Sequence, residues 1–254
     1  MIALKKKEEI QLLMQSGAIL ASILKSVSQK AAEGISLLDL ETYAQDLCAR
    51  ANVRPAFLGY QPEGADHPFP AALCTSLNDV VVHGIPSSYR LKNGDVLKLD
   101  MGVVYEGMYT DAAVTVTIGR VNSRVKKLIT STYHALEAAI SVCKAGRTMG
   151  DIGYVISRQA HKDGFFVLKD LTGHGVGYEV HEDPIIFNYG QKEKGARLVP
   201  GMVLALEPMF SLSSEHVIQN NDESYSSADR SITAHFEHTV VITEKKPLVV
   251  TRAV

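Results

Sequence analysis

The sequence contains no tryptophan, only three cysteines and little imbalance of charge. Cys48, Cys74 and Cys143 are odd in number and form no CxxC pair, which argues against a disulfide framework or a cysteine zinc site and favours a reducing compartment. A formal net charge of −2 gives no basic excess for neutralising a nucleic-acid backbone. No uninterrupted run of about 18 apolar residues occurs, and the N-terminus lacks the apolar stretch of a signal peptide. We therefore expect a cytoplasmic protein with no membrane partner and no specific nucleic-acid partner.

With 254 residues, 46% of them hydrophobic, the chain is long enough to bury a substantial core. Apolar spacing and capping residues predict four helices, and alternating apolar residues predict a hairpin and two later strands. The polar segment 211–230 is predicted to be a surface loop or lid. The predicted elements are helices from about 10 to 24, from Ser36, over 123–144 and from Thr148, a hairpin over 94–118, and strands near 202–207 and 235–242.

Four short patterns recur in the same order, at offsets of roughly 100 to 125 residues. Any one match could arise by chance, but four in one order indicate a duplication. We infer two related halves, approximately 1–120 and 121–254, packed into a single domain 1–254. The matching segments are 34–40 with 146–152, 82–86 with 180–184, 94–100 with 201–207 and 111–116 with 237–242.

The duplication places an acid at the same two positions in each half. Asp100 and Glu207 end matching strands, and Asp111 and Glu237 lie in matching later strands. If Glu106 and its following glycine form the hairpin turn, Asp100 and Asp111 share one face of the hairpin. Four carboxylates at one site repel one another, and two divalent cations would balance their charge. A water bridging such a pair of metals becomes a hydroxide nucleophile near neutral pH.

Histidines complete the predicted site. His174 stands among glycines that permit close backbone approach, and it is the expected nitrogen ligand. His83 and His181 form a symmetric pair, expected to act as acid–base or carbonyl-stabilising groups. His235 is two residues from Glu237, so we weigh a supporting role there equally against an ordinary core position.

Six strings in the sequence together resemble type I methionine aminopeptidases of bacterial type, over nearly the whole chain. The resemblance implies an α+β pita-bread fold, a curved antiparallel sheet covered by two pseudo-symmetric pairs of helices. It implies Asp100, Asp111, His174, Glu207 and Glu237 as metal ligands. The strings are Asn78-Asp-Val-Val-Val-His-Gly-Ile-Pro86, Leu99-Asp-Met-Gly102, Tyr109-Thr-Asp111, Gly173-His-Gly-Val-Gly177, Leu206-Glu-Pro-Met209 and Phe236-Glu-His-Thr239.

The same resemblance implies excision of the first methionine from nascent, deformylated proteins whose second residue is small. His83, His181 and Glu207 are the implied catalytic residues, with Glu207 shuttling the proton. The implied methionine pocket holds Tyr60, Phe69 and Cys74. Val180 stands where many relatives have phenylalanine, and Tyr225 is the nearest replacement for a tryptophan that many relatives carry.

The implied metals are two divalent ions per chain, with cobalt, manganese, iron and zinc all open. A monovalent cation beside Asn78, Val80 and Thr233 is implied by resemblance alone. The ribosome is a candidate partner, and the family default is a monomer. Two alternatives stay open: an X-Pro aminopeptidase or prolidase-like peptidase, and a non-catalytic pita-bread protein that binds a protein or nucleic acid.

Overall fold

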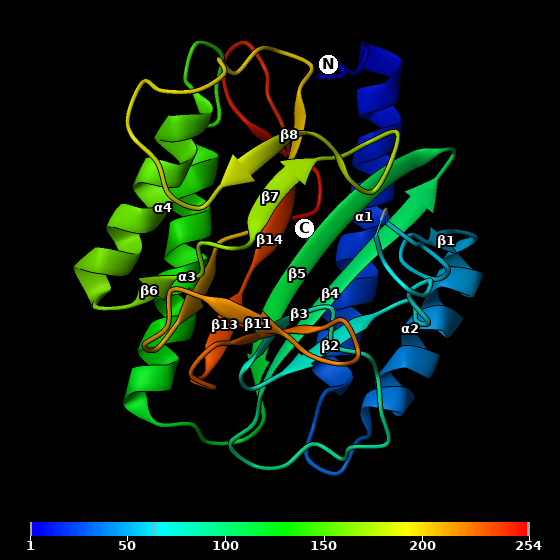
Figure 1. Ribbon diagram of the computed structural model, residues 1–254. Coiled ribbons are helices and arrows are strands. Elements are labelled where there is room, and N and C mark those ends of the chain that lie inside the picture. The colour runs from blue at the N-terminus through cyan, green and yellow to red at the C-terminus, as the bar shows by residue number, and fades with distance from the viewer. Residues whose placement is uncertain (1, 63, 253–254) are drawn as a thin grey trace.

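The computed structural model describes residues 2–62 and 64–252, and within them the chain forms four helices arranged as two pairs (Figure 1). The second and fourth helices begin with the predicted capping boxes, Ser36 with Asp39 and Thr148 with Asp151. These caps satisfy backbone N–H groups that the first turn of a helix leaves free. The helices are α1 (Lys7–Lys30), α2 (Leu37–Ala51), α3 (Ser123–Val142) and α4 (Met149–Asp163).

Nine strands form one antiparallel sheet, and the two helix pairs lie behind its two halves (Figure 1). In its main path β14 from the second half pairs with β5 from the first, so one sheet runs through both halves. The proposal of one catalytic domain rests on this shared sheet. The strands are β1 (Arg54–Pro55), β2 (Cys74–Leu77), β4 (Val96–Tyr105), β5 (Met108–Thr117), β7 (Thr172–Gly175), β8 (Glu182–Phe187), β9 (Val203–Leu206), β14 (Glu237–Val241) and β15 (Leu248–Val249).

Two small three-stranded sheets flank the large one. The predicted loop or lid 211–230 is wrong in part, because β11 and β12 lie inside it and β12 pairs with β3 from the first half. The predicted strand near 235–242 is two strands, which belong to different sheets. The small sheets contain β6 (Phe166–Val167), β10 (Met209–Ser211) and β13 (Thr233–His235), and β3 (Val80–Val82), β11 (Val217–Gln219) and β12 (Tyr225–Ser227).

Alternation along β4 separates the core from the functional face. Leu97, Leu99 and Met101 are fully buried against α1 and α2, whereas Lys98 and Asp100 point to the other face of the strand. Equivalent leucines of β9 pack into a second cluster with α3 and α4. Truncating one such leucine to alanine costs about 2–5 kcal/mol. The two helix pairs thus hold the rear face of the sheet, and the polar face is left for chemistry.

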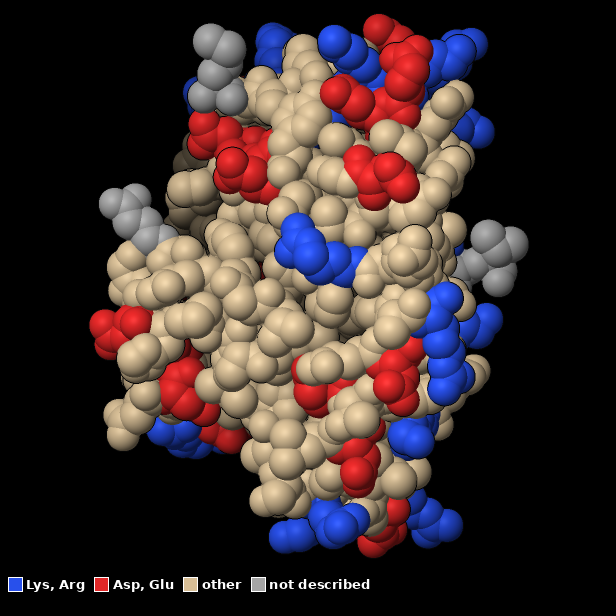
Figure 2. Space-filling view, turned by 90° about the vertical axis from the view of Figure 1, so that its right-hand side faces the viewer, with Lys and Arg blue, Asp and Glu red and all other residues tan. Residues whose placement is uncertain are grey.

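Helix α1 is the one described helix whose length and composition would also suit a membrane span. Its apolar residues are instead used inside the fold. Leu20 and Leu24 are buried in the same cluster as the β4 leucines, and Leu13 packs beside Val203 and Val241. A core helix of a globular domain has this pattern of burial. The surface seen in Figure 2 carries Lys and Arg interspersed with Asp and Glu, with no continuous basic stripe on that face.

Candidate metal centre

Three carboxylates lie on one face of the sheet because of strand register. Asp100 on β4 and Glu237 on β14 are both paired with Ala113 of β5, from opposite sides. Residues paired directly across a sheet point to the same face, and so do alternate residues of one strand. Asp111 is two residues from Ala113, so it joins them. The predicted hairpin register, with Gly102 opposite Asp111 and a turn at Glu106-Gly107, is confirmed.

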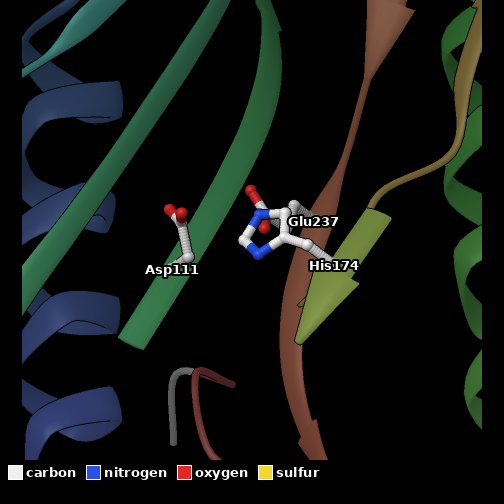
Figure 3. A group of neighbouring side chains, drawn as sticks. All are labelled: Asp111, His174 and Glu237. Atoms are coloured by element: carbon white, nitrogen blue, oxygen red, sulfur yellow. The ribbon is translucent and has the colours of Figure 1, made fainter. Parts of the chain in front are cut away.

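The second half supplies the remaining two groups. His174 on β7 is paired with Ala205 of β9, and Glu207 follows two residues after Ala205. His174 Nε2 lies 3.4 Å from Glu207 Oε1. Ligand atoms of Asp111, His174 and Glu237 all lie within 4.8 Å of one another, and they approach from three separate strands (Figure 3). The structure therefore brings the five residues expected as metal ligands to one place.

The pKa values of the five residues in this cluster are far from their ordinary values. Burial raises the pKa of Asp111 to about 7. Burial, and then neighbouring carboxylates, hold the pKa of Asp100, Glu207 and Glu237 well above the ordinary values. Burial lowers the pKa of His174 to about 4, so its ring is neutral at pH 7. A neutral imidazole beside crowded carboxylates has the protonation state that a metal ligand needs.

The donor set fits divalent metal ions. One oxygen each of Asp100, Asp111 and Glu237 is buried without a hydrogen-bond partner within the described structure, an arrangement that costs free energy unless something else compensates. His174 Nδ1 lies 2.9 Å from the carbonyl of Gly175. A carbonyl only accepts, so Nδ1 carries the hydrogen and the Nε2 lone pair is left for a metal.

His83 and His181 lie at the wall of a cavity of about 1270 Å³ that opens onto the carboxylates. The His174 and His181 rings meet edge to face, with centroids 4.4 Å apart. Tyr60 Oη lies 2.9 Å from His181 Nδ1, and the ring of Tyr225 on β12 is 5.8 Å from that of His83. The two symmetric histidines thus each have an aromatic neighbour above the same carboxylate cluster.

An apolar pocket adjoins the carboxylates. Tyr60, Phe69 and Cys74 line it as expected. Phe57 also belongs to this cluster and was missed, although it stands only three residues before Tyr60 in the aromatic loop segment. Burial raises the pKa of the Cys74 thiol well above its ordinary value, with Asp100 and Asp111 adding to the effect. A protonated thiol is a poor nucleophile, so Cys74 serves as pocket wall.

His235 contacts a different acid from the one that its sequence position suggested. It lies on β13, which pairs with β10 and not with the large sheet. Its Nε2 is 3.5 Å from Glu207 Oε2, and the side chain is 1% exposed. Burial, followed by the Lys98 charge, lowers the pKa of His235 to about 3, which keeps the ring neutral. His235 therefore supports Glu207 from behind, while His174 contacts the other carboxylate oxygen.

Comparisons with known proteins give matches along nearly the whole chain. The family model described as metallopeptidase family M24 matches residues 11–244. The methionine aminopeptidase of Aquifex aeolicus is 39% identical over 98% of this chain and 98% of its own length. The crystal structure of methionine aminopeptidase from Thermotoga maritima has a TM-score of 0.94 at 38% identity, covering 99% of this chain and all of that one.

A prolidase from Pyrococcus horikoshii shares the fold alone. Its sequence identity is 20% and its TM-score is 0.75. The match covers 99% of this chain but only 64% of the prolidase. The remaining third of that protein therefore has no equivalent in the present chain.

Proposed function

The chain belongs to metallopeptidase family M24 and, within it, to the methionine aminopeptidases with their pita-bread fold, and on that premise we propose how its site removes the N-terminal methionine. The proposed substrates are nascent, deformylated proteins with a small second residue. The proposal rests on one observation, the convergence of Asp111, His174 and Glu237 beside Asp100 and Glu207. It occurs in a chain that is similar to methionine aminopeptidases over 98% of its length.

We assign the metal-holding role to these five residues, with two divalent ions balancing four carboxylates. Bound ions of this kind lower the pKa of water and polarise the scissile carbonyl. Asp111 and Glu237 lie on neighbouring strands at the centre of the sheet. There each carboxylate would be within reach of both metal ions. His174 breaks the symmetry, because in the first half its place on the paired strand is taken by Ser76. The two metal positions should therefore differ.

Glu207 is the residue best placed to hold and move the proton. Burial and the nearby carboxylates raise its pKa, which makes it a stronger base than an ordinary glutamate. We assign it to take the proton of the attacking water and to pass that proton to the departing amine. The rings of His174 and His235 lie on its two sides, with their Nε2 atoms 3.4 and 3.5 Å from its two oxygens, and these contacts restrict its movement. A group that accepts and then donates must keep one orientation through both steps.

His181 is proposed to contact the scissile carbonyl, and His83 to bind the substrate on the opposite wall. If Tyr60 donates its hydroxyl hydrogen to His181 Nδ1, the ring carries its own hydrogen on Nε2. That hydrogen is then available to an oxygen on which negative charge develops. His83 is held by the turn after β3, where its backbone has φ +59°.

The apolar pocket is proposed to take the methionine side chain. Phe57 and Phe69 meet edge to face with centroids 6.5 Å apart, and Val180 packs in the same buried cluster as Cys74. An unbranched thioether makes favourable contacts with aromatic ring edges. Because His181 lines the same cavity as Phe57 and Phe69, the pocket leads to the histidine proposed to contact the carbonyl. A methionine seated there places its peptide bond over the carboxylate cluster.

The X-Pro alternative is not favoured, because the likeness to methionine aminopeptidases is higher in sequence identity and covers nearly all of both chains. A non-catalytic binding role is disfavoured by the complete set of metal-binding side chains. We further propose that the enzyme acts as a cytoplasmic monomer on chains leaving the ribosome. The three cysteines are buried and unpaired, which supports a reducing compartment.

The decisive experiment measures methionine release from Met-Ala-Ser by metal-free protein reloaded with Mn²⁺, Fe²⁺, Co²⁺ or Zn²⁺. We expect activity that a chelator removes, slower release from Met-Leu-Ser, and none from formyl-Met-Ala-Ser. Glu207→Gln should lose at least about a hundredfold in kcat, as removal of a general acid–base does. The exposed Glu8→Gln variant removes the same charge and should be unaffected. Faster cleavage of X-Pro peptides, or no release with any metal, refutes the proposal.

A further inference from the structure

Lys98 is a cation buried completely inside the protein, on the same face of β4 as Asp100. Its side chain is 0% exposed, and no carboxylate lies within ion-pair distance among the described residues. Burial lowers the pKa of Lys98 to about 7, although the charge of Asp79 opposes that effect. A dry ammonium costs free energy, so an apolar residue here would be the simpler choice. The roles assigned above leave this group unused.

The Lys98 ammonium is aimed at a backbone oxygen. Its Nζ donates to the carbonyl of Asn78 at 2.7 Å. That oxygen also accepts from the backbone N–H and the hydroxyl of Thr233, each at 3.1 Å, and the same hydroxyl lies 3.2 Å from the carbonyl of Val80. These are the three residues beside which the resemblance implies a monovalent cation. A second cation on the Asn78 oxygen would meet the ammonium at contact distance, where like charges repel.

We propose that the Lys98 ammonium replaces the monovalent cation at this place and fixes the segments around the metal centre, so that the enzyme needs no such ion. Three segments meet at the Asn78 oxygen. The turn at Asn78 leads through β3 to His83, β13 carries Thr233 and ends at His235, and β4 carries Asp100. One charge-assisted hydrogen bond therefore ties together supports for three site residues.

The strand next to Lys98 completes the arrangement. Thr115 of β5 is paired directly with Lys98. Its hydroxyl donates to the carbonyl of His235 at 2.6 Å and accepts from the His235 N–H at 3.0 Å. The two cross-strand partners thus hold opposite ends of β13, Lys98 through Asn78 and Thr115 directly. Loss of the ammonium should loosen the end at Thr233 and let His235 drift from Glu207.

The duplicated halves use matching places differently. In the repeated pattern Lys98 aligns with Ala205. In the second half Ala205 is paired with His174, whereas in the first half Lys98 is paired with Ser76. In the second half the nitrogen is that of His174, an expected metal ligand on β7, the strand paired with β9. In the first half the nitrogen is that of Lys98, on β4 itself, where it acts as an internal cation that positions its neighbours.

The test compares wild type, Lys98→Ala and Lys98→Met at one pH and at equal ionic strength in KCl, NH₄Cl or tetramethylammonium chloride. This role rests on the proposed peptidase activity, so the melting temperature of the metal-free protein is recorded as an independent readout. Wild type should vary less than twofold among the salts in both kcat and melting temperature. Lys126→Ala, at an exposed lysine of α3, serves as the matched control.

Lys98→Ala opens space beside the Asn78 carbonyl. It should lose at least tenfold in kcat, with a smaller change in KM, and K⁺ or NH₄⁺ should restore several-fold and raise its melting temperature, whereas tetramethylammonium should not. Lys98→Met fills the space and should stay impaired in every salt. Dependence of wild type on K⁺, full activity of Lys98→Met, or an impaired Lys98→Ala that no small cation restores would each overturn the proposal. If Lys98→Ala does not fold, the wild-type and Lys98→Met arms still decide it. If wild type releases no methionine, the proposed function fails. The melting temperatures in the different salts still test whether the Lys98 ammonium replaces a monovalent cation.

Discussion

The ion pair between Lys5 and Glu182 joins the N-terminal segment to the loop that carries His181. The Lys5 side chain is 1% exposed and that of Glu182 is 11% exposed, and Lys5 Nζ donates to Glu182 Oε2. The ammonium also sits 4.7 Å from the centre of the Tyr178 ring. The other oxygen of Glu182 accepts from the backbone N–H groups of Tyr178 and Glu179. Glu182 thus organises the loop from within.

Replacing Lys5 with methionine keeps most of the volume and removes the charge. A carboxylate that loses its partner in so dry a place destabilises a protein by about 3–5 kcal/mol. In a domain of this size each kcal/mol lowers the melting temperature by about 2–4 °C, so a fall of roughly 6–20 °C is expected. Removing both charges, in Lys5→Met with Glu182→Gln, should cost much less than the two single changes together.

Activity should fall along with stability, because His181 directly precedes Glu182. We expect a lower kcat for Lys5→Met at temperatures where the variant is fully folded, with metal binding unchanged. The loss follows from a looser loop between Gly177 and Glu182, not from any contact of Lys5 with substrate. Methionine release and metal titration by calorimetry separate the two effects.

Urea unfolding of the four proteins in this double-mutant cycle gives the coupling energy. A surface pair serves as control: Lys169 and Glu215 form an ion pair with side chains 39% and 34% exposed, and exposed pairs of this kind contribute about 0–1 kcal/mol. A coupling energy between Lys5 and Glu182 below about 0.5 kcal/mol would refute the reasoning. So would a Lys169→Met variant destabilised as strongly as Lys5→Met.

Three further predictions concern the centre itself. The pKa of Asp111 is raised to about 7 in the metal-free fold against 3.8 ordinarily, so between these values the folded state binds more protons than the unfolded one. This group should stabilise the metal-free protein by up to about 1.4 kcal/mol per pH unit as the pH falls from 7. His174 and His235, whose pKa values are lowered, act in the opposite direction, so the contribution is measured in urea titrations as the difference between wild type and Asp111→Asn, and a difference that does not grow as the pH falls would contradict the assignment. His235→Ala should weaken metal binding or activity about 10- to 100-fold, measured by calorimetry and turnover, and unchanged values would return His235 to an ordinary core role. Tyr60→Phe should lower kcat roughly five- to tenfold, as loss of one hydrogen bond to His181 implies, whereas a change in KM alone would mean that Tyr60 only shapes the pocket.

Much of the fold could be predicted from local sequence patterns and from the internal repeat. The Glu106-Gly107 turn set the hairpin register, because a two-residue turn fixes which residues face each other and side chains alternate with period two. The capping boxes at Ser36 and Thr148 marked helix starts within one residue. The repeated acids were correctly expected to lie together, since matching positions in a duplicated sheet face a common centre.

Pairings between segments that are distant in sequence could not be predicted in this way. The polar stretch 211–230 has no strong strand pattern of its own, yet β12 pairs with β3 and brings Tyr225 beside His83. His235 was judged from its neighbour Glu237, but a break at Phe236 sends it to another sheet and to Glu207. In both cases pairing with a remote strand outweighed local preference.

By itself the sequence determined the kind of site: four carboxylates and a histidine, symmetric in pairs and broken by His174. Only the tertiary structure decided what supports that site. Nothing around Lys98 in the sequence marks it as a buried ammonium on the Asn78 carbonyl, and nothing around Lys5 points to Glu182, 177 residues away. A charged side chain is buried or exposed according to what the rest of the chain packs around it. That packing depends on long-range contacts, which no local pattern records.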